Sequence, residues 1–217
     1  MPVGRKRVHG EATAAALLDA AEAIVESEGV EALTVRRVAD EVGTTTRAVY
    51  STLGSKEALL SGLGERAFEM LGAAVAALPH SDDPAADLVA AGMVFRRFAL
   101  THPALFRVGF RVQDSVPQEV AARFRPSAAR ALGGLHELIR RVDDGGGLGG
   151  RTQDDATWQF DALCEGLAIG DLRCGTPHTN TASKATWADA LGALVAGWRL
   201  TSPTRNRRRP TRIRQPA

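Results

Sequence analysis

The stretch Leu33–Leu60, LTVRRVADEVGTTTRAVYSTLGSKEALL, predicts two short helices, a tight turn and the start of a third helix. Apolar residues recur at intervals of three and four between Val35 and Val42, which places them on one helical face. Thr34, just before this run, has the side chain of an N-cap, and Gly43, just after it, can adopt the left-handed backbone that ends a helix. The first short helix is therefore bounded at both ends.

Two further capping residues predict where the next helices begin. Thr45 can cap a second short helix, with Ala48 and Val49 turned inward, and Ser55 can cap a third helix whose first turn carries Glu57. Two helices joined by a short turn that contains glycine fit the helix-turn-helix motif, in which the second helix enters the major groove of DNA.

The second short helix presents polar side chains that can contact DNA. Arg47 can bond to the O6 and N7 atoms of guanine, and Thr45 and Thr46 can bond base edges or touch the thymine methyl group. Lys56 lies at a helix N-terminus, where backbone amides and the helix dipole favour a phosphate. Arg36 is a further phosphate candidate. The alternative for each of these residues alone is an ordinary surface side chain.

Three runs in this stretch, TVRRVA from Thr34, GTTTRAVY from Gly43 and GSKEAL from Gly54, resemble the N-terminal domain of the TetR family of bacterial transcription regulators. The resemblance extends over about residues 11–68. It implies an all-α protein in which a three-helix DNA-binding domain precedes a helical ligand-binding and dimerisation domain.

The resemblance also assigns contacts at the end of the second short helix. It implies that Tyr50 contacts the DNA backbone. Where the family usually has an aromatic residue or histidine and then phenylalanine, this sequence has Thr52 and Leu53. The Thr52 hydroxyl can still donate to a phosphate, and Leu53 keeps the core apolar. The predicted DNA-binding residues are Arg36, Thr45, Thr46, Arg47, Tyr50, Thr52 and Lys56.

Composition limits what else the chain can be. Two cysteines are too few for a disulfide framework, and no apolar run approaches the ~18–20 residues that cross a bilayer. We therefore expect a cytoplasmic protein with no membrane partner. The chain carries 27 bases and 25 acids, and six of the arginines lie in residues 203–217, so the remainder is weakly acidic. DNA binding must then depend on where the bases are placed rather than on bulk charge.

Periodic apolar residues predict the remaining helices and the domain limits. The predicted organisation is a flexible basic arm over 1–10, a helix-turn-helix domain over 11–55, a connecting helix over 56–78, a helical ligand-binding and dimerisation domain over 79–202, and a disordered arginine-rich tail over 203–217. The arm and the tail can attract phosphates, and the alternative for both is a solvated terminus. Helices are expected over 11–28, 61–77, 84–101, 104–110, 117–142 with a kink at Pro126, 153–173, and 183–200 capped by Ser183. The glycine-rich segment 143–151 lacks a Walker lysine and is interpreted as a flexible connection.

Aromatic and apolar residues gather in the second domain and predict an effector pocket. Such pockets are lined by apolar side chains with a few polar groups, although any one of these residues can instead be plain core. The predicted pocket residues are Met93, Phe95, Phe98, Phe106, Phe110, Phe124 and Trp158, with Phe160 in the same apolar set.

The TetR resemblance implies that the last two long helices pair with those of a second subunit to form a four-helix bundle. The alternative is that their apolar faces fill the chain's own core. The predicted interface residues are Leu163, Leu167, Trp187, Leu191, Leu194 and Trp198.

The sequence contains no set of residues that holds together as an active site. Its five histidines are scattered without metal-ligand spacing, so we expect no cofactor and no enzyme. Asp161 and Glu165 share a helical face, which is usually a solvated or capping feature.

The expected function is a ligand-responsive repressor that binds a palindromic DNA operator as a homodimer and answers to a small apolar effector. One alternative is a helical small-molecule-binding protein or enzyme that keeps the helix-turn-helix for packing only. Another is an activator or co-regulator that answers to a protein.

Overall fold

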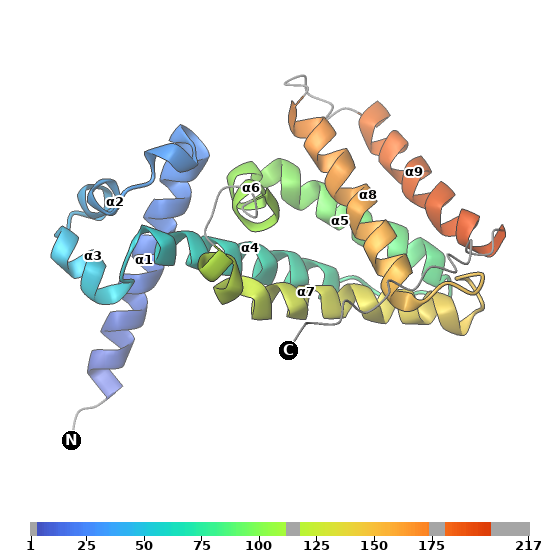
Figure 1. The fold of residues 1–217 in the computed structure, drawn as a ribbon, viewed down its shortest axis with the longest axis horizontal. Helices are drawn as coiled ribbons and strands as arrows, with labels where there is room; N and C mark the ends of the chain where they lie inside the picture. Colours follow the sequence, from blue (N-terminus) through green and yellow to red (C-terminus); the bar gives the residue numbers. More distant parts are fainter. Residues whose placement is uncertain (1–3, 112–117, 174–180, 201–217) are drawn as a thin grey trace, which may run out of the picture.

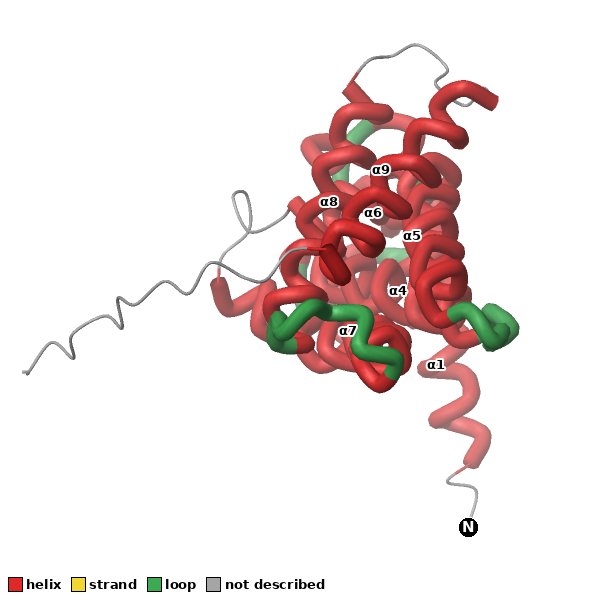
Figure 2. Tube along the Cα trace, turned by 90° about the vertical axis from the view of Figure 1, so that its right-hand side faces the viewer, coloured by secondary structure: helices red, strands yellow, loops and turns green. Residues whose placement is uncertain are grey.

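The structure, a computed structural model, describes residues 4–111, 118–173 and 181–200, and the regular elements in these ranges are all helical (Figures 1 and 2). The elements are α1 (Gly4–Glu28), the short 3-10 helix η1 (Val30–Ala32), α2 (Val35–Val42), α3 (Thr46–Thr52), α4 (Lys56–Ala76), α5 (Pro84–Thr101), α6 (Pro103–Arg111), α7 (Gln118–Asp144), α8 (Gln153–Arg173) and α9 (Thr181–Leu200). The predicted all-α fold is confirmed. No helix of the described residues is long and apolar enough to cross a membrane.

The three predicted caps form as expected. The Thr34 hydroxyl accepts a hydrogen bond from the Arg37 amide at 3.1 Å, Thr45 accepts one from Ala48 at 3.2 Å, and Ser55 accepts one from Ala58 at 3.3 Å. Gly43 ends α2 with φ of 71°, in the left-handed region that a side chain would disfavour. Local sequence thus fixes the ends of α2, α3 and α4.

Helix α1 differs from its prediction in where it begins and in what its acids do. It starts at Gly4, so residues 4–10 are helical and not a flexible arm; Arg and Lys are good helix formers, and no proline follows Pro2 in this segment. The apolar stripe of this helix predicts that the acids on its other side, among them Glu22 and Glu26, face water. Instead Glu22 pairs with Arg66 of α4 at 2.7 Å, and Glu26 accepts a hydrogen bond from the backbone of α6.

Helix α4 connects the two halves of the molecule. It begins beside α3 and continues along α7 (Figure 1), and it also contacts α1, α5 and α6. Close approach to α7 is possible because Gly72 lacks a side chain: a Cβ there would lie 3.3 Å from Cα of Ala131. Helix α5 contacts α7, α8 and α9. Helix α4 therefore begins in the N-terminal half of the molecule and packs as part of its C-terminal half.

Smaller differences concern the second half. Helix α7 continues through Pro126, and α9 begins at Thr181, so Ser183 is not its cap. Ser183 is buried instead and accepts a hydrogen bond from Arg96 at 3.1 Å. The predicted tail over 203–217 lies outside the described residues, as does the side chain of Phe124.

Candidate DNA-binding surface and ligand cavity

An open hollow lies where α2, α3 and α4 meet. It has a volume of about 530 Å³, and the N-termini of α2 and α4 both border it. Free backbone amides and the helix dipole make such ends favourable for a phosphate. The residues that line the hollow are Thr34, Val35, Arg36, Thr46, Tyr50, Ser55, Lys56 and Glu57.

Of the predicted cationic and phenolic groups, Arg36, Tyr50 and the half-buried Lys56 line the hollow, and Arg47 lies outside its lining. The Arg36 side chain is 87% exposed and only loosely paired with Asp40 at 3.9 Å, and Tyr50 is 56% exposed. Arg47 is exposed on α3. The neighbouring Arg37 is different, because it pairs with Glu28 and Glu41 at 2.8 Å and joins α1 to α2. Arg36 and Arg47 are therefore open to DNA, whereas Arg37 supports the domain.

Of the three predicted threonines, Thr45 and Thr52 form hydrogen bonds at the start of α3 and within it. Thr46 is exposed and borders the hollow. Thr45 is also exposed; its oxygen accepts the cap bond from Ala48, and its hydroxyl hydrogen can still be donated to another group. The Thr52 hydroxyl donates its hydrogen to the carbonyl of Ala48 at 2.8 Å, so a bond to a phosphate would have to replace this one, and the phosphate contact of Thr52 stays a prediction.

Glu57 is a charged group of the hollow that the list of DNA-binding residues did not include. The Ser55 hydroxyl, the backbone amide of its own residue and then Lys56 lower the pKa of its carboxyl group. It is therefore ionised at neutral pH and opposes a phosphate beside Lys56. The sequence could have indicated this, because Glu57 lies in the first turn of a predicted helix, next to Lys56.

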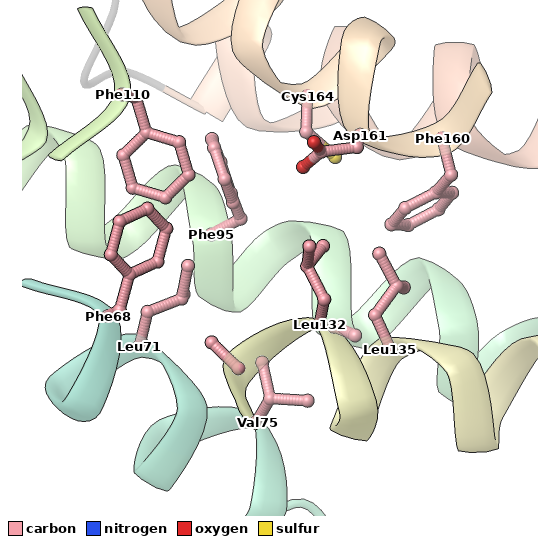
Figure 3. Close-up of a pocket in the computed structure, with 12 residues that line it drawn as sticks. Phe68, Leu71, Val75, Phe95, Phe110, Leu132, Leu135, Phe160, Asp161 and Cys164 are labelled. Carbon is pink, nitrogen blue, oxygen red and sulfur yellow. The ribbon is translucent and has the colours of Figure 1, made fainter. Parts of the chain in front are cut away.

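An apolar cavity lies between α4, α5, α6, α7 and α8 (Figure 3). Its volume is about 50 Å³, and it is partly open to solvent. Phe110 is central to its wall: its ring lies 4.8 Å from that of Phe68, 5.1 Å from Phe95 and 5.2 Å from Phe106, between ring centres. The lining residues are Phe68, Leu71, Val75, Ala91, Phe95, Phe110, Ala131, Leu132, Leu135, Phe160, Asp161 and Cys164.

Two carboxyl groups of α8 lie at or near this cavity, which corrects the expectation that Asp161 and Glu165 are merely solvated. Burial raises the pKa of Asp161, and burial followed by the neighbouring Asp161 raises the pKa of Glu165 to about 7. Burial also raises the pKa of the Cys164 thiol, so Cys164 is not a reactive thiolate. Within the described ranges no cluster of three or more His, Cys, Asp or Glu residues could hold a metal ion.

Comparison with known families assigns both halves of the chain. The model of bacterial regulatory proteins of the tetR family matches residues 17–63, and the model of the tetracyclin repressor-like C-terminal domain matches residues 88–194. The chain belongs to the TetR family. It is therefore a DNA-binding transcription regulator, and the hollow beside α3 lies within its DNA-binding domain.

Solved structures share the fold of this TetR protein. A regulatory protein of the tetR family from Rhodococcus has a TM-score of 0.65 and 21% identity, with 84% of this chain and 94% of that chain covered. PfmR, a TetR family transcriptional regulator from Thermus thermophilus, has a TM-score of 0.63 and 20% identity, with coverage of 82% and 96%. AibR, solved with isovaleryl coenzyme A and operator DNA, has a TM-score of 0.60 and 14% identity, with coverage of 82% and 95%. A comparison with curated proteins gave no significant match.

The structure of this TetR protein places only some of the predicted pocket residues at the cavity. Phe95 and Phe110 line the cavity, together with Phe160. Phe98 and Phe106 are buried in the core, and Met93 is half-buried against it, so these three do not line the cavity. Trp158 is 73% exposed and cannot belong to a pocket inside this subunit. The prediction at Phe124 falls on a side chain that the structure does not describe.

The predicted dimer interface of this TetR protein needs a similar correction. Trp187, Leu191 and Trp198 are at most 1% exposed, so they fill the subunit's own core and are wrong as interface residues. Their indole groups have internal partners: Trp187 donates to Asp171 at 3.0 Å and Trp198 to Gln159 at 2.8 Å. Leu163, Leu167 and Leu194 are half-buried against that core, and their role between subunits stays a prediction.

Proposed function

We propose that this TetR protein is a cytoplasmic, ligand-responsive repressor that binds a palindromic operator as a homodimer. The observation that carries the proposal is the course of α4. Its first residue, Lys56, borders the DNA-binding hollow, and Phe68 and Leu71 of the same helix line the cavity. A ligand that moves these side chains would therefore tilt the helix that positions Lys56.

The other link between the two sites runs through α6. Phe110 of α6 lines the cavity, and near the start of this helix the Ala104 amide donates to Glu26 of α1 at 3.0 Å. His102, just before α6, lies 3.9 Å from Glu22 of α1. A ligand changes DNA affinity only if it binds the two arrangements of the subunit with different affinity. Displacement of Phe110 supplies such a difference, because α6 moves relative to α1.

The proposed homodimer uses the outer faces of α8 and α9. Exposed positions on α8 follow a four-residue spacing, and those after Trp158 are small, which lets a second helix approach closely. Neither Gly166 nor Gly170 would bring an added Cβ within 4 Å of another residue of the subunit. The proposed contact residues are Trp158, Ala162, Gly166 and Gly170 of α8 and Ala185, Ala193, Ala196 and Leu200 of α9. A twofold pair would present two copies of α3, as a palindrome requires.

AibR supports the arrangement as a whole, since a protein of similar fold was solved with both an acyl coenzyme A and operator DNA. That ligand belongs to AibR. The test for the present chain begins with selection of bound fragments from genomic DNA, followed by gel shifts of the recovered sequence at two salt concentrations.

We expect one shared palindromic sequence, bound by a dimer with an affinity that falls steeply with salt. Small apolar compounds that raise the thermal midpoint should then release this DNA. Absence of an enriched sequence would overturn the proposal and favour a helical small-molecule-binding protein that keeps the helix-turn-helix for packing. Ligands that bind and leave DNA affinity unchanged would refute the switch alone.

A further inference from the structure

The cavity has a charge asymmetry that an apolar effector does not explain. Among the described residues that line it, Asp161 is the one with an acidic group, and none is basic. The remaining lining residues come from five helices and are apolar apart from the Cys164 thiol. An acid placed alone in such surroundings costs free energy, because its charged form loses hydration.

Asp161 has no partner among the described residues. Within the described ranges its carboxyl group forms no hydrogen bond or ion pair, and burial is the cause of its raised pKa. Figure 3 shows this carboxyl group pointing toward the cavity from α8, with Phe95 on one side and Phe160 on the other. By contrast Asp171, ten residues further along the same helix, is paired with Arg96 at 3.3 Å. The described residues therefore supply a counterion for one partly buried acid of α8, Asp171, and none for the other, Asp161.

Four phenyl rings, those of Phe68, Phe95, Phe110 and Phe160, also line the cavity. The face of an aromatic ring attracts a cation, most strongly where water is excluded. The rings and the carboxyl group thus favour the same kind of ligand, one with a positive head and an apolar body. They disfavour a carboxylate or a phosphate, which would meet Asp161 without a compensating base.

We propose that the effector of this protein is a lipophilic amine, bound as its ammonium ion with the nitrogen at Asp161 and the hydrocarbon against the phenyl rings. The inference rests on the proposed function in taking this cavity as the effector site. It goes beyond that function in naming the ligand's charge and the residue that recognises it. Asp161 is thereby a specificity-determining residue.

The size of the cavity limits the body of the amine. A water molecule occupies roughly 10–15 Å³ on this measure, so about 50 Å³ holds an ammonium group and a short hydrocarbon. A longer body has to extend through the open side. A six-membered ring with one amino group is a suitable probe.

Binding of an ammonium ion should also release a proton. Glu165 lies one turn from Asp161, and its pKa of about 7 means that this pair of acids is not fully ionised at neutral pH. A cation beside Asp161 favours the charged form of both acids. The heat of binding of the amine should therefore depend on the ionisation enthalpy of the buffer, and that of a neutral alcohol should not.

The experiment compares three ligands of one shape on the full chain: cyclohexylamine, cyclohexanol and cyclohexanecarboxylate, by titration calorimetry at pH 7. We expect the amine to bind about tenfold to a hundredfold more tightly than the alcohol, as for a hydrogen bond to a charged group, and the carboxylate to bind weakest. Equal binding of amine and alcohol, preference for the carboxylate, or no binding of the amine would overturn the proposal.

The variant Asp161→Asn, which keeps the size of the side chain, should bind cyclohexylamine and cyclohexanol equally and lose the proton release. Asp155→Asn is the matched control, because Asp155 is exposed on the same helix. A retained preference for the amine in Asp161→Asn would also refute the assignment. The comparison of ligands on the unaltered protein needs no variant, so it stands even if Asp161→Asn folds poorly.

A gel shift separates this inference from the proposed function. If cyclohexylamine binds through Asp161 and releases the selected DNA, both are supported. If it binds through Asp161 and leaves the DNA bound, the ligand class stands and the switch fails. If the protein selects no DNA at all, the repressor proposal fails, and calorimetry still decides the ligand.

Discussion

Arg36 and Arg37 are adjacent in sequence, and their different surroundings separate a candidate DNA contact from a structural one. Arg37 holds Glu28 and Glu41, whereas Arg36 projects beside the hollow with Tyr50 and Lys56. A pattern of helical faces predicts that both arginines lie near the surface. Only the three-dimensional structure shows which one already has close partners, because one of the two acids that pair with Arg37, Glu28, belongs to α1. The same limit explains Thr52, whose hydroxyl is used by its own helix.

Single substitutions at the DNA surface should separate phosphate contacts from base contacts. Lys56→Ala and Tyr50→Ala should weaken binding to all sequences, and Lys56→Ala should reduce the salt slope by about one. Arg47→Ala should instead relax preference at one base pair, with a loss of about 1–3 kcal/mol of discrimination. Gel shifts of the selected operator and its single-base variants at two salt concentrations measure both effects.

The control for these variants is Arg97→Ala, since Arg97 is an exposed arginine of α5. It should change neither the affinity nor the salt slope. If Arg47→Ala keeps full discrimination at every base pair, Arg47 does not read bases and the docking of α3 has to be reconsidered.

Asp87 should make stability depend on pH in the acid range. It accepts hydrogen bonds from Ser81 and Arg141, which lower its pKa to about 2. Because the folded pKa lies below the unfolded value, its contribution is complete above about pH 4 and is lost as the pH falls toward 2. Asp87→Asn should therefore cost about 1.5–3 kcal/mol at pH 7 and much less near pH 2.5.

Urea unfolding at the two pH values measures this difference. Asp82→Asn, at an exposed position in the loop just before α5, should leave the unfolding midpoint unchanged at both pH values. An equal loss for Asp87→Asn at pH 7 and pH 2.5 would mean that charge at Asp87 is not what stabilises the contact between α5 and α7.

At the scale of the elements, α5 and α9 pack closely at Gly92, which is the described helical glycine with the least space for an added Cβ. A Cβ added to Gly92 would lie 2.5 Å from a methyl carbon of Leu191, which is fully buried. Gly92→Ala should therefore destabilise the protein by about 1–3 kcal/mol through overpacking. Gly133→Ala in α7 is the matched control, because its Cβ would meet nothing within 4 Å.

The two alanine variants should have opposite signs. Gly133→Ala should stabilise the protein by about 0.5–1 kcal/mol, since alanine loses less backbone entropy in a helix. Urea midpoints of the two variants give the comparison. A neutral result for Gly92→Ala would mean that Leu191 and Phe160 can shift, and that the region between α5, α8 and α9 is less firmly packed than the contact distances indicate.

Helix periodicity predicted that these elements exist, and it was less able to say what each face meets. In α9 it correctly placed Trp187, Leu191 and Trp198 on one stripe, and the structure turns that stripe toward α5 and α8 rather than toward a partner. In α8, Trp158 looked like a pocket residue because it is aromatic, although its position places it on the outer face. The spacing of apolar residues in the sequence defines one face of a helix. Which element packs against that face depends on how the other helices cross.

At the scale of the whole molecule, the same helices connect the two candidate sites. Helix α4 carries residues of both sites, and α6 contacts the cavity at Phe110 and α1 at Glu26. The caps, and the gathering of Arg36, Tyr50 and Lys56 at one hollow, were largely predictable, because they depend on local chemistry between Thr34 and Lys56. The cavity was not, since residues 68–164 of five helices have to converge before Asp161 is left without a partner.

The dimer is the last feature that belongs to the whole molecule, and Trp158 provides its sharpest test. Because this side chain is 73% exposed in the subunit, Trp158→Glu should leave the folding of the subunit intact. In the proposed pair it would bury a charge on each side of the interface, so the variant should be monomeric at micromolar concentration. Its affinity for the palindrome should fall to about that for a single half-site, because the two copies of α3 are no longer held in one dimer.

Sedimentation equilibrium and gel shifts with full and half operators measure these effects. Ala23→Glu, at an exposed position on α1, is the control and should remain dimeric. A Trp158→Glu protein that stays dimeric would place the interface on another face. A monomer that still binds the full palindrome with undiminished affinity would remove the link between dimerisation and DNA recognition, since a single α3 would then suffice for the whole site.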